Sequence, residues 1–260
     1  MSLTAKLMLS PVLVAQAIAT RARLPRLPEP EGPRQGVAGA ASLARAGKPL
    51  RLLIAGDSSA AGVGVAKQRD ALAHRLATNL AKAVQAQVSW HLRARSGLTT
   101  AQTMALLLEE GVGRHHLVAD VAVVVTGVND VVDQVPSHRA VAAREALANW
   151  LRNGCGAQHV VFAPLPPIHH FPGLPQPLRW VAGADARRHN RALQQWAATR
   201  ADVSCVDMQM PLNSDVMAAD GFHPGEPVYR YCAAAIAAHI ARHVWPGLHL
   251  HLHPQHRHHA

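Results

Sequence analysis

The sequence predicts an α/β protein in which helices cover both faces of a five-stranded parallel sheet, a three-layer α/β/α sandwich. From Leu50 onward, apolar runs of about four to eight residues alternate with longer amphipathic segments. The run "VAVVVT" at 121–126 is continuous and β-branched, as expected of a strand that is buried on both faces. Strands are expected at 51–55, 88–94, 121–126, 160–163 and 203–206, with helices at 66–84, 100–110, 137–152, 180–200 and 227–244.

Composition and charge favour a globular body without a nucleic-acid partner. Apolar residues make up 49% of the 260 residues and charged residues only 16%, which is unlike a disordered chain. The net charge is +10, and half of it lies in residues 1–50, where seven Lys or Arg face only Glu29 and Glu31. Because no run of Lys and Arg with interleaved aromatics occurs, nucleic-acid binding is not predicted.

The chain divides into four parts. Residues 1–20 contain the apolar stretch "LMLSPVLVAQAIA", which is shorter than the roughly 20 residues that a membrane span needs. We expect a retained helix that docks on the body or makes peripheral membrane contact through residues 1–25, with a cleaved signal peptide as the alternative. A proline-rich connector follows at 21–49, then the main domain at 50–246 and a histidine-rich tail at 247–260.

The number and spacing of the cysteines indicate the redox state of the cellular compartment. Cys155, Cys205 and Cys232 cannot all pair, and no C-x-x-C spacing occurs. This favours a reducing environment, so we expect a cytoplasmic or peripheral membrane location, although secretion stays open. Histidine-rich tails are more often solvated than metal-binding, and no metal or other cofactor is predicted.

Three small turns follow the first three predicted strands. They are Gly-Asp-Ser at 56–58, Ser-Gly at 96–97 and Gly-Val-Asn-Asp at 127–130. Ligands of open α/β sheets bind at the carboxyl ends of the strands, so these turns should converge on one crevice. None of them supplies a cation, and neither the P-loop nor the dinucleotide fingerprint matches the glycines that follow, which disfavours a phosphate site.

A serine nucleophile fits the same turns better. Asp220 and His223 lie three residues apart in "ADGFHPG", a spacing that lets the carboxylate orient the imidazole of His223 toward Ser58. Candidate donors to an oxyanion are the N–H of Ser58, the N–H of Gly97 and the side-chain amide of Asn129. These residue types predict nucleophilic catalysis at this crevice.

The four sequence blocks resemble the SGNH hydrolases, also called GDSL esterases and lipases. The matching blocks are "GDSS", "RSGLT", "GVND" and "DGFHP", in order over residues 56–224. The resemblance implies a flavodoxin-like sandwich and metal-free ester hydrolysis through an acyl-serine, with the roles given above. Ser59 stands where many members carry leucine. Mutation must therefore exclude Ser59 as the nucleophile. An α/β-hydrolase elbow is disfavoured, since Ala60 replaces its second glycine.

We therefore expect a serine esterase acting on a small-molecule ester, with a short-chain or lipid-type acyl group. Thioesters, lysophospholipids and acetylated carbohydrates are alternative substrates, and a noncatalytic binding module is the alternative from another class. The proline-rich loop after the fourth strand also reaches the carboxyl edge, where Ile168, His169 and Phe171 are candidates for substrate binding.

Overall fold

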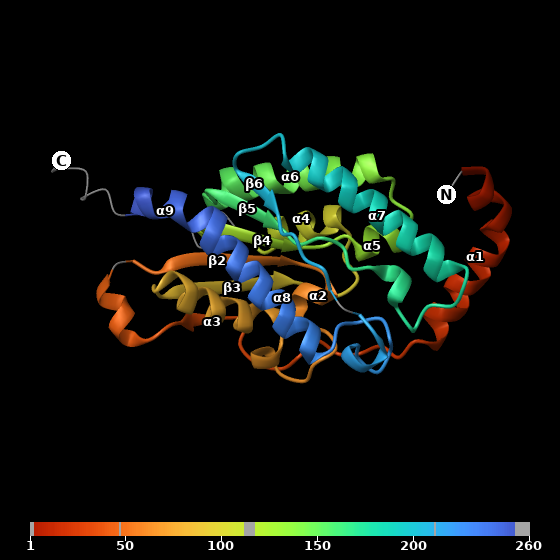
Figure 1. Cartoon of the computed structure of the whole chain (residues 1–260), viewed down its shortest axis with the longest axis horizontal. Coiled ribbons are helices and arrows are strands. Elements are labelled where there is room, and N and C mark those ends of the chain that lie inside the picture. Colours follow the sequence, from red (N-terminus) through yellow and green to blue (C-terminus); the bar gives the residue numbers. More distant parts are fainter. Residues whose placement is uncertain (1–2, 47, 112–117, 211, 253–260) are drawn as a thin grey trace.

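The computed structural model describes residues 3–46, 48–111, 118–210 and 212–252. Its centre is a sheet with the strand order β1-β3-β2-β4-β5-β6, which lies between two layers of helices (Figure 1). The strands are β1 (Gln35–Ala38), β2 (Leu50–Gly56), β3 (Val88–Ala94), β4 (Val121–Val125), β5 (His159–Phe162) and β6 (Val203–Cys205). The predicted three-layer α/β fold is confirmed.

Strands β2 to β6 are parallel, and alternate residues of each strand serve opposite faces of the sheet. Leu52 and Ile54 of β2 pack beneath α3 (Leu72–Val84) and α8 (Glu226–His239). Leu53 and Ala55 face α6 (Ser137–Cys155) and α7 (Leu178–Ala197) on the other side. Burial on both faces explains why the central strands β2 and β4 are almost wholly apolar.

The strand count is a correction to the sequence prediction. The sixth strand, β1, pairs antiparallel with β3 at the edge of the sheet, inside the stretch that was expected to be an irregular connector. Its sequence, Gln-Gly-Val-Ala, carries little strand signal of its own. Gly36 lies against the ring of Trp90, where an added Cβ would come within 3.2 Å of the indole nitrogen. Long-range packing therefore creates this strand.

The helix expected from residue 66 begins later, at Leu72. Gln68–Asp70 instead forms a short 3-10 helix beside the connector. Lys67 bridges to Glu31, and the buried Gln68 donates to the carbonyl of Ala61. The remaining α-helices are α1 (Leu3–Arg23), α2 (Ser58–Ala61), α4 (Thr100–Glu109), α5 (Val128–Val132) and α9 (Trp245–Leu252), with a π-helical turn at Ile240–Val244 before α9. Further 3-10 helices lie at Ala41–Ala46, Ile168–His170 and Ser214–Val216.

Helices α1 and α9 lie at opposite ends of the molecule (Figure 1). Helix α1 is held against the start of α7 by Gln16, whose amide donates to the carbonyl of Gln176 and accepts from the N–H of Leu178. Within the ranges given above, no helix has both the length and the hydropathy needed to cross a membrane. Residues 253–260 of the histidine-rich tail lie outside the described residues.

Candidate active site

Ser58 is the first residue of the short helix α2, directly beyond the carboxyl end of β2. Gly56 allows the tight exit from the strand, because a Cβ there would overlap the carbonyl oxygen of Val125. Asp57 caps the helix: its Oδ1 accepts from the N–H of Ser59 at 2.9 Å. The local backbone thus places the Ser58 side chain at the edge of the sheet where the parallel strands end.

A tight turn before α8 carries Asp220 and His223. The Oδ1 atom of Asp220 accepts the N–H groups of Phe222 and His223, both at 2.9 Å. Its Oδ2 atom lies 2.6 Å from Nδ1 of the His223 ring. Burial alone would raise the pKa of Asp220, but these three hydrogen bonds outweigh it and hold that pKa below its ordinary value.

The turn and the serine meet at hydrogen-bond distance, with 3.1 Å between Nε2 of His223 and Oγ of Ser58. Asp220, His223 and Ser58 therefore form a continuous chain of contacts, although the serine is 162 positions from the aspartate in the sequence. Since Asp220 accepts at Nδ1, the imidazole carries its proton there and presents a basic Nε2 to the hydroxyl. This is the arrangement of a base-activated nucleophile.

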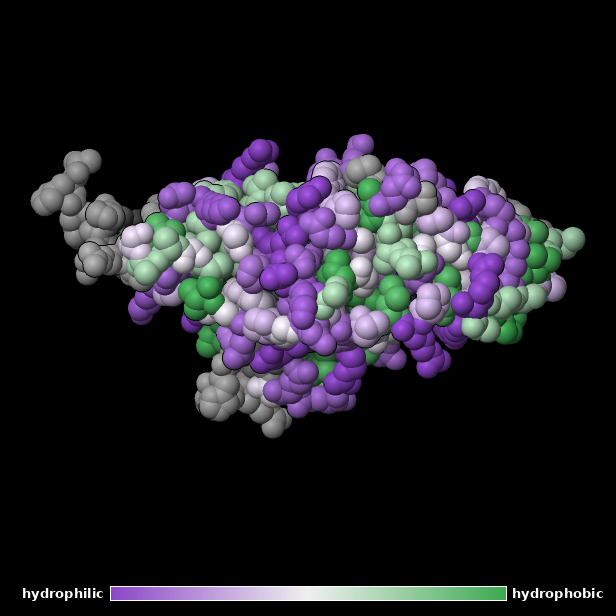
Figure 2. All heavy atoms as spheres, turned by 90° about the horizontal axis from the view of Figure 1, so that it is seen from below, coloured by the Kyte–Doolittle hydropathy of each residue, from purple (hydrophilic) through white to green (hydrophobic). Residues whose placement is uncertain are grey.

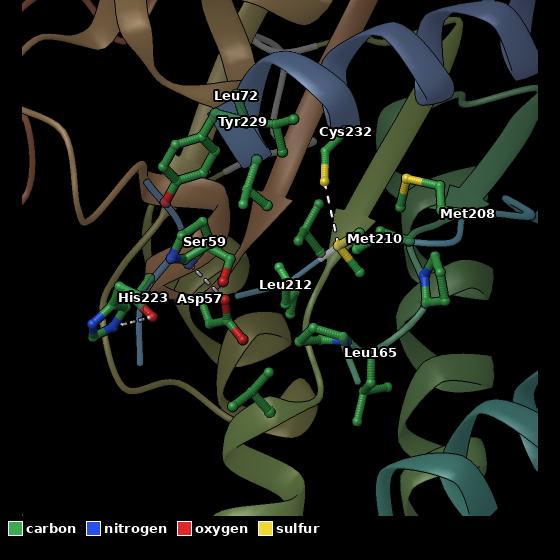
Figure 3. Close-up of a pocket in the computed structure, with 18 of the residues that line it drawn as sticks. Asp57, Ser59, Leu72, Leu165, Met208, Met210, Leu212, His223, Tyr229 and Cys232 are labelled. Carbon is green, nitrogen blue, oxygen red and sulfur yellow. Dashed lines mark hydrogen bonds between the residues drawn. The ribbon is translucent and has the colours of Figure 1, made fainter. Parts of the chain in front are cut away.

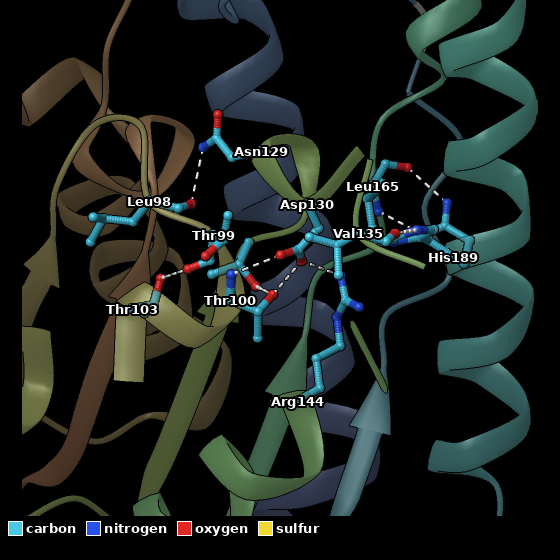
Figure 4. A network of polar contacts seen from close by, with 12 residues as sticks. Leu98, Thr99, Thr100, Thr103, Asn129, Asp130, Val135, Arg144, Leu165 and His189 are labelled. Carbon is cyan, nitrogen blue, oxygen red and sulfur yellow. Dashed lines mark hydrogen bonds and ion pairs between the residues drawn. The ribbon is translucent and has the colours of Figure 1, made fainter. Parts of the chain in front are cut away.

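The two candidate oxyanion residues lie on neighbouring loops. Gly97 has φ +84°, and a Cβ built on it meets nothing within 4 Å, so this backbone borders open space. Asn129 donates one amide hydrogen to the carbonyl of Leu98 at 3.0 Å, which links the two loops (Figure 4). An amide nitrogen has two hydrogens, so Asn129 keeps a second donor.

Glu29 supports the Gly97 loop and was missed by the sequence analysis. Its Oε1 accepts from the N–H and the hydroxyl of Ser96, at 2.8 and 3.1 Å. Its Oε2 accepts from Arg34 at 2.8 Å, and Arg34 also contacts the carbonyl of Ala94. A residue of the proline-rich stretch thus holds the end of β3, which no local pattern in the sequence indicates.

A buried polar network fixes the Gly-Val-Asn-Asp turn (Figure 4). Asp130 accepts from the N–H and the hydroxyl of Thr100 at 3.0 and 2.6 Å, and Arg144 lies 3.5 Å from the same carboxylate. The side chains of Asp130 and Arg144 are almost fully buried, so neither ion can be removed without leaving the other unpaired in the core. The network therefore anchors the loop that carries Asn129.

An apolar cavity is lined in part by Ser58 and His223, and Figure 3 shows it from close by. Phe171 lines it, but the other two residues that were expected to bind substrate do not. Ile168 is buried in the apolar cluster behind the loop, and His169 contacts Arg187 and packs on Gly183. The loop that does contribute several side chains follows β6, with Met208, Met210, Leu212 and Met217.

The family of this protein follows from its similarity to known proteins. The sequence pattern of the GDSL-like lipase/acylhydrolase family matches residues 54–231, more than half of the chain. The chain belongs to this family. It is thus a carboxylic ester hydrolase of the SGNH type, which removes the support for a noncatalytic binding module. No curated protein matches the sequence significantly.

Solved structures share the fold of this SGNH hydrolase at low identity. A lipase from a goat rumen metagenome is 20% identical with a TM-score of 0.59, covering 75% of this chain and 98% of its own. A lipase/acylhydrolase from Enterococcus faecalis is 18% identical, with a TM-score of 0.58 and coverages of 74% and 95%. A carbohydrate acetylesterase from Sinorhizobium meliloti is 16% identical, with a TM-score of 0.53 and coverages of 74% and 98%.

Proposed function

We propose that this protein is a serine esterase whose nucleophile is Ser58, with His223 as the general base and Asp220 as the group that orients the imidazole. Nε2 of His223 takes the hydroxyl proton while Oγ bonds to the acyl carbon. The tetrahedral intermediate then expels the alcohol, which receives that proton from His223. Water repeats the sequence: His223 deprotonates it, it attacks the acyl-serine, and Ser58 leaves with its proton restored.

The negative oxygen of each tetrahedral intermediate needs donors that are already in place. We assign this role to the N–H groups of Ser58 and Gly97 and to the second amide hydrogen of Asn129. The positive φ and open surroundings of Gly97, together with the bond from Asn129 to Leu98, support the assignment. All three are neutral donors, so the site is suited to an oxyanion that appears only during the reaction.

The observation that carries the proposal is the contact chain from Asp220 through His223 to Ser58 at the mouth of an apolar cavity. The apolar lining favours a lipid-type acyl group over the acetyl group of a sugar ester, because an acetyl group has little apolar surface to bury. An ester and a thioester of the same acid would use the same triad. Thioesters and lysophospholipids are therefore alternative substrates at this site.

The test compares the native protein with Ser58→Ala and Ser59→Ala in p-nitrophenyl butyrate hydrolysis. Ser58→Ala should lower kcat by about four orders of magnitude or more, since the nucleophile is lost. The matched variant Ser59→Ala should keep activity within a few-fold of native. Equal activity of native protein and Ser58→Ala, or loss only in Ser59→Ala, would reject Ser58 as the nucleophile.

We also propose that α1 makes peripheral contact with an anionic membrane surface. Its outward face exposes Met8, Val12, Val14 and Ile18, which are 47–81% accessible, and hydrophobic atoms gather at this end of the molecule (Figure 2). No acidic residue occurs before Glu29, whereas Arg21, Arg23 and Arg26 follow the apolar face. An apolar face with basic neighbours suits an anionic bilayer interface.

Co-sedimentation with vesicles tests this contact. The native protein should bind vesicles that contain phosphatidylserine more strongly than neutral ones. Replacing Met8 and Ile18 by serine should weaken binding about ten-fold or more, because their apolar surface no longer enters the bilayer. The control Val37→Ser removes an equally exposed apolar side chain on β1 and should bind like the native protein. Absence of binding, or equal effects of both changes, would contradict the proposal.

A further inference from the structure

The cavity beyond Ser58 has its polar groups at one end only. Ser58 lines the cavity together with Asp57 and His223. In Figure 3, Asp57 and His223 lie on one side of the cavity, and Met208, Met210 and Cys232 lie across it from them. Among the described lining residues, Asp57 and His223 are the only acidic or basic side chains. A ligand that fills this space must therefore be apolar along its length and polar where it meets the serine.

Helix α8 forms one wall and gives the cavity its length. Val228, Cys232 and Ile236 recur at four-residue intervals, so they lie along one face of the helix. The helix begins just after His223, which places Val228 near the triad and Ile236 deepest. Eight residues of α-helix rise about 12 Å. The wall that an inserted chain can follow is therefore about 12 Å long.

The opposite wall comes from the loop after β6 and the end of β5. Met208, Met210 and Leu212 belong to that loop, and Ala163 and Leu165 follow β5. Sγ of Cys232 lies 3.5 Å from Sδ of Met210, so these two side chains from opposite walls are in contact. Methionine side chains are flexible and adapt to an inserted apolar group. Burial raises the pKa of the Cys232 thiol to about 12, which keeps this group uncharged at neutral pH.

We infer that this cavity is an acyl-binding pocket for an unbranched chain of medium length, and that Cys232 and Met210 set the preferred length. An extended chain advances about 1.2 Å per bond, as a polypeptide backbone does, so a wall of about 12 Å matches an acyl group of about ten carbons. The acyl carbon lies at Ser58, and the methyl end lies toward Ile236. The inference rests on the proposed function, since it gives the acyl group of the substrate that Ser58 attacks.

The test is a series of p-nitrophenyl esters from acetate to palmitate, used below their aggregation limits, with kcat/KM measured for each. The native protein should show kcat/KM rising at least about ten-fold from acetate to an optimum near eight to ten carbons, since each added methylene buries apolar surface. Longer chains outgrow the pocket and should gain nothing further. A profile that peaks at acetate, or that stays flat, would overturn the inference.

Variants within one helix locate the pocket. Cys232→Phe should move the optimum to about four to six carbons. The matched control Ala234→Phe places the same ring on an exposed position of α8 and should keep the native optimum. If Cys232→Phe does not fold, Met210→Ala serves instead and should move the optimum to longer chains. An unchanged optimum in the folded pocket variants would place the acyl chain elsewhere.

The outcomes separate this inference from the proposed function. Loss of all ester hydrolysis in Ser58→Ala, with a native profile that peaks at acetate, would uphold the nucleophile and reject the pocket. Ester hydrolysis that persists in Ser58→Ala would reject the nucleophile, whatever the chain-length profile.

Discussion

The pKa values of two buried aspartates near His223 are shifted in opposite directions. Asp220 accepts three hydrogen bonds, and these hold its pKa below the ordinary value. Burial raises the pKa of Asp57 to about 7, and the N–H of Ser59 and the nearby His223 only partly offset this effect. Burial alone thus does not make an aspartate a catalytic partner. The number and direction of its donors decide whether it holds a charge beside the imidazole.

Of the variants that test this contrast between Asp220 and Asp57, Asp220→Asn is expected to have the largest effect on activity. The amide cannot stabilise the imidazolium and can hold the ring in the wrong tautomer, so kcat should fall by roughly 10⁴ with KM little changed. Steady-state kinetics on p-nitrophenyl butyrate measure this. Asp207→Asn makes the same exchange at an exposed position and should behave like the native protein. A loss below about ten-fold in Asp220→Asn would remove Asp220 from the triad.

Asp57→Asn should affect activity less, because asparagine still offers an oxygen to the N–H of Ser59. We expect a loss in kcat of less than about ten-fold. Its clearer signature is the pH dependence of stability. The folded protein holds a proton on Asp57 up to about pH 7, whereas the unfolded chain releases it near the ordinary aspartate value, so this group makes the native protein less stable as pH rises from about 4 to 7.

Urea unfolding at pH 5 and pH 7.5 checks the sign. Relative to the native protein, Asp57→Asn should lose less stability between these two pH values. Asp220 acts in the other direction, because a lowered pKa stabilises the fold above about pH 4 and this stabilisation disappears on acidification. The same pH slope in native protein and Asp57→Asn would show that Asp57 stays ionised in the fold.

A smaller effect is expected on the oxyanion side of the site. Glu29→Ala removes the acceptor for both donors of Ser96 and should let the Gly97 loop shift, which lowers kcat by about ten-fold with KM nearly unchanged. The acyl-length optimum should stay the same, since the pocket lies elsewhere. Glu31→Ala removes a neighbouring, exposed carboxylate that pairs with Lys67 and serves as the matched control. Equal kinetics in the two variants would limit Glu29 to a structural role.

Sequence patterns predicted the features of this molecule that depend on residues close together in the chain. The β-branched run of β4, the turns after the strands and the Asp220–His223 spacing are each written within a few residues, and together they predicted the fold and the residues that the structure brings together. Glu29 depends on its contacts with Ser96 and β1 on its pairing with β3, and both sets of contacts join residues that are distant in sequence. The methionines after β6 form no recognisable sequence pattern. The pocket wall that they form could therefore be identified only from the structure.

The proposed mechanism requires that Ser58 is acylated during turnover. The most direct measurement is mass spectrometry of protein quenched in acid within milliseconds of mixing with p-nitrophenyl octanoate, followed by tryptic digestion. The peptide 52–67 contains Ser58 and Ser59 as its only hydroxyl side chains. The account predicts that the octanoyl mass appears on this peptide, with fragments placing it on Ser58, and that it is absent in Ser58→Ala. Acylation of Ser59 or of another peptide during turnover would contradict it.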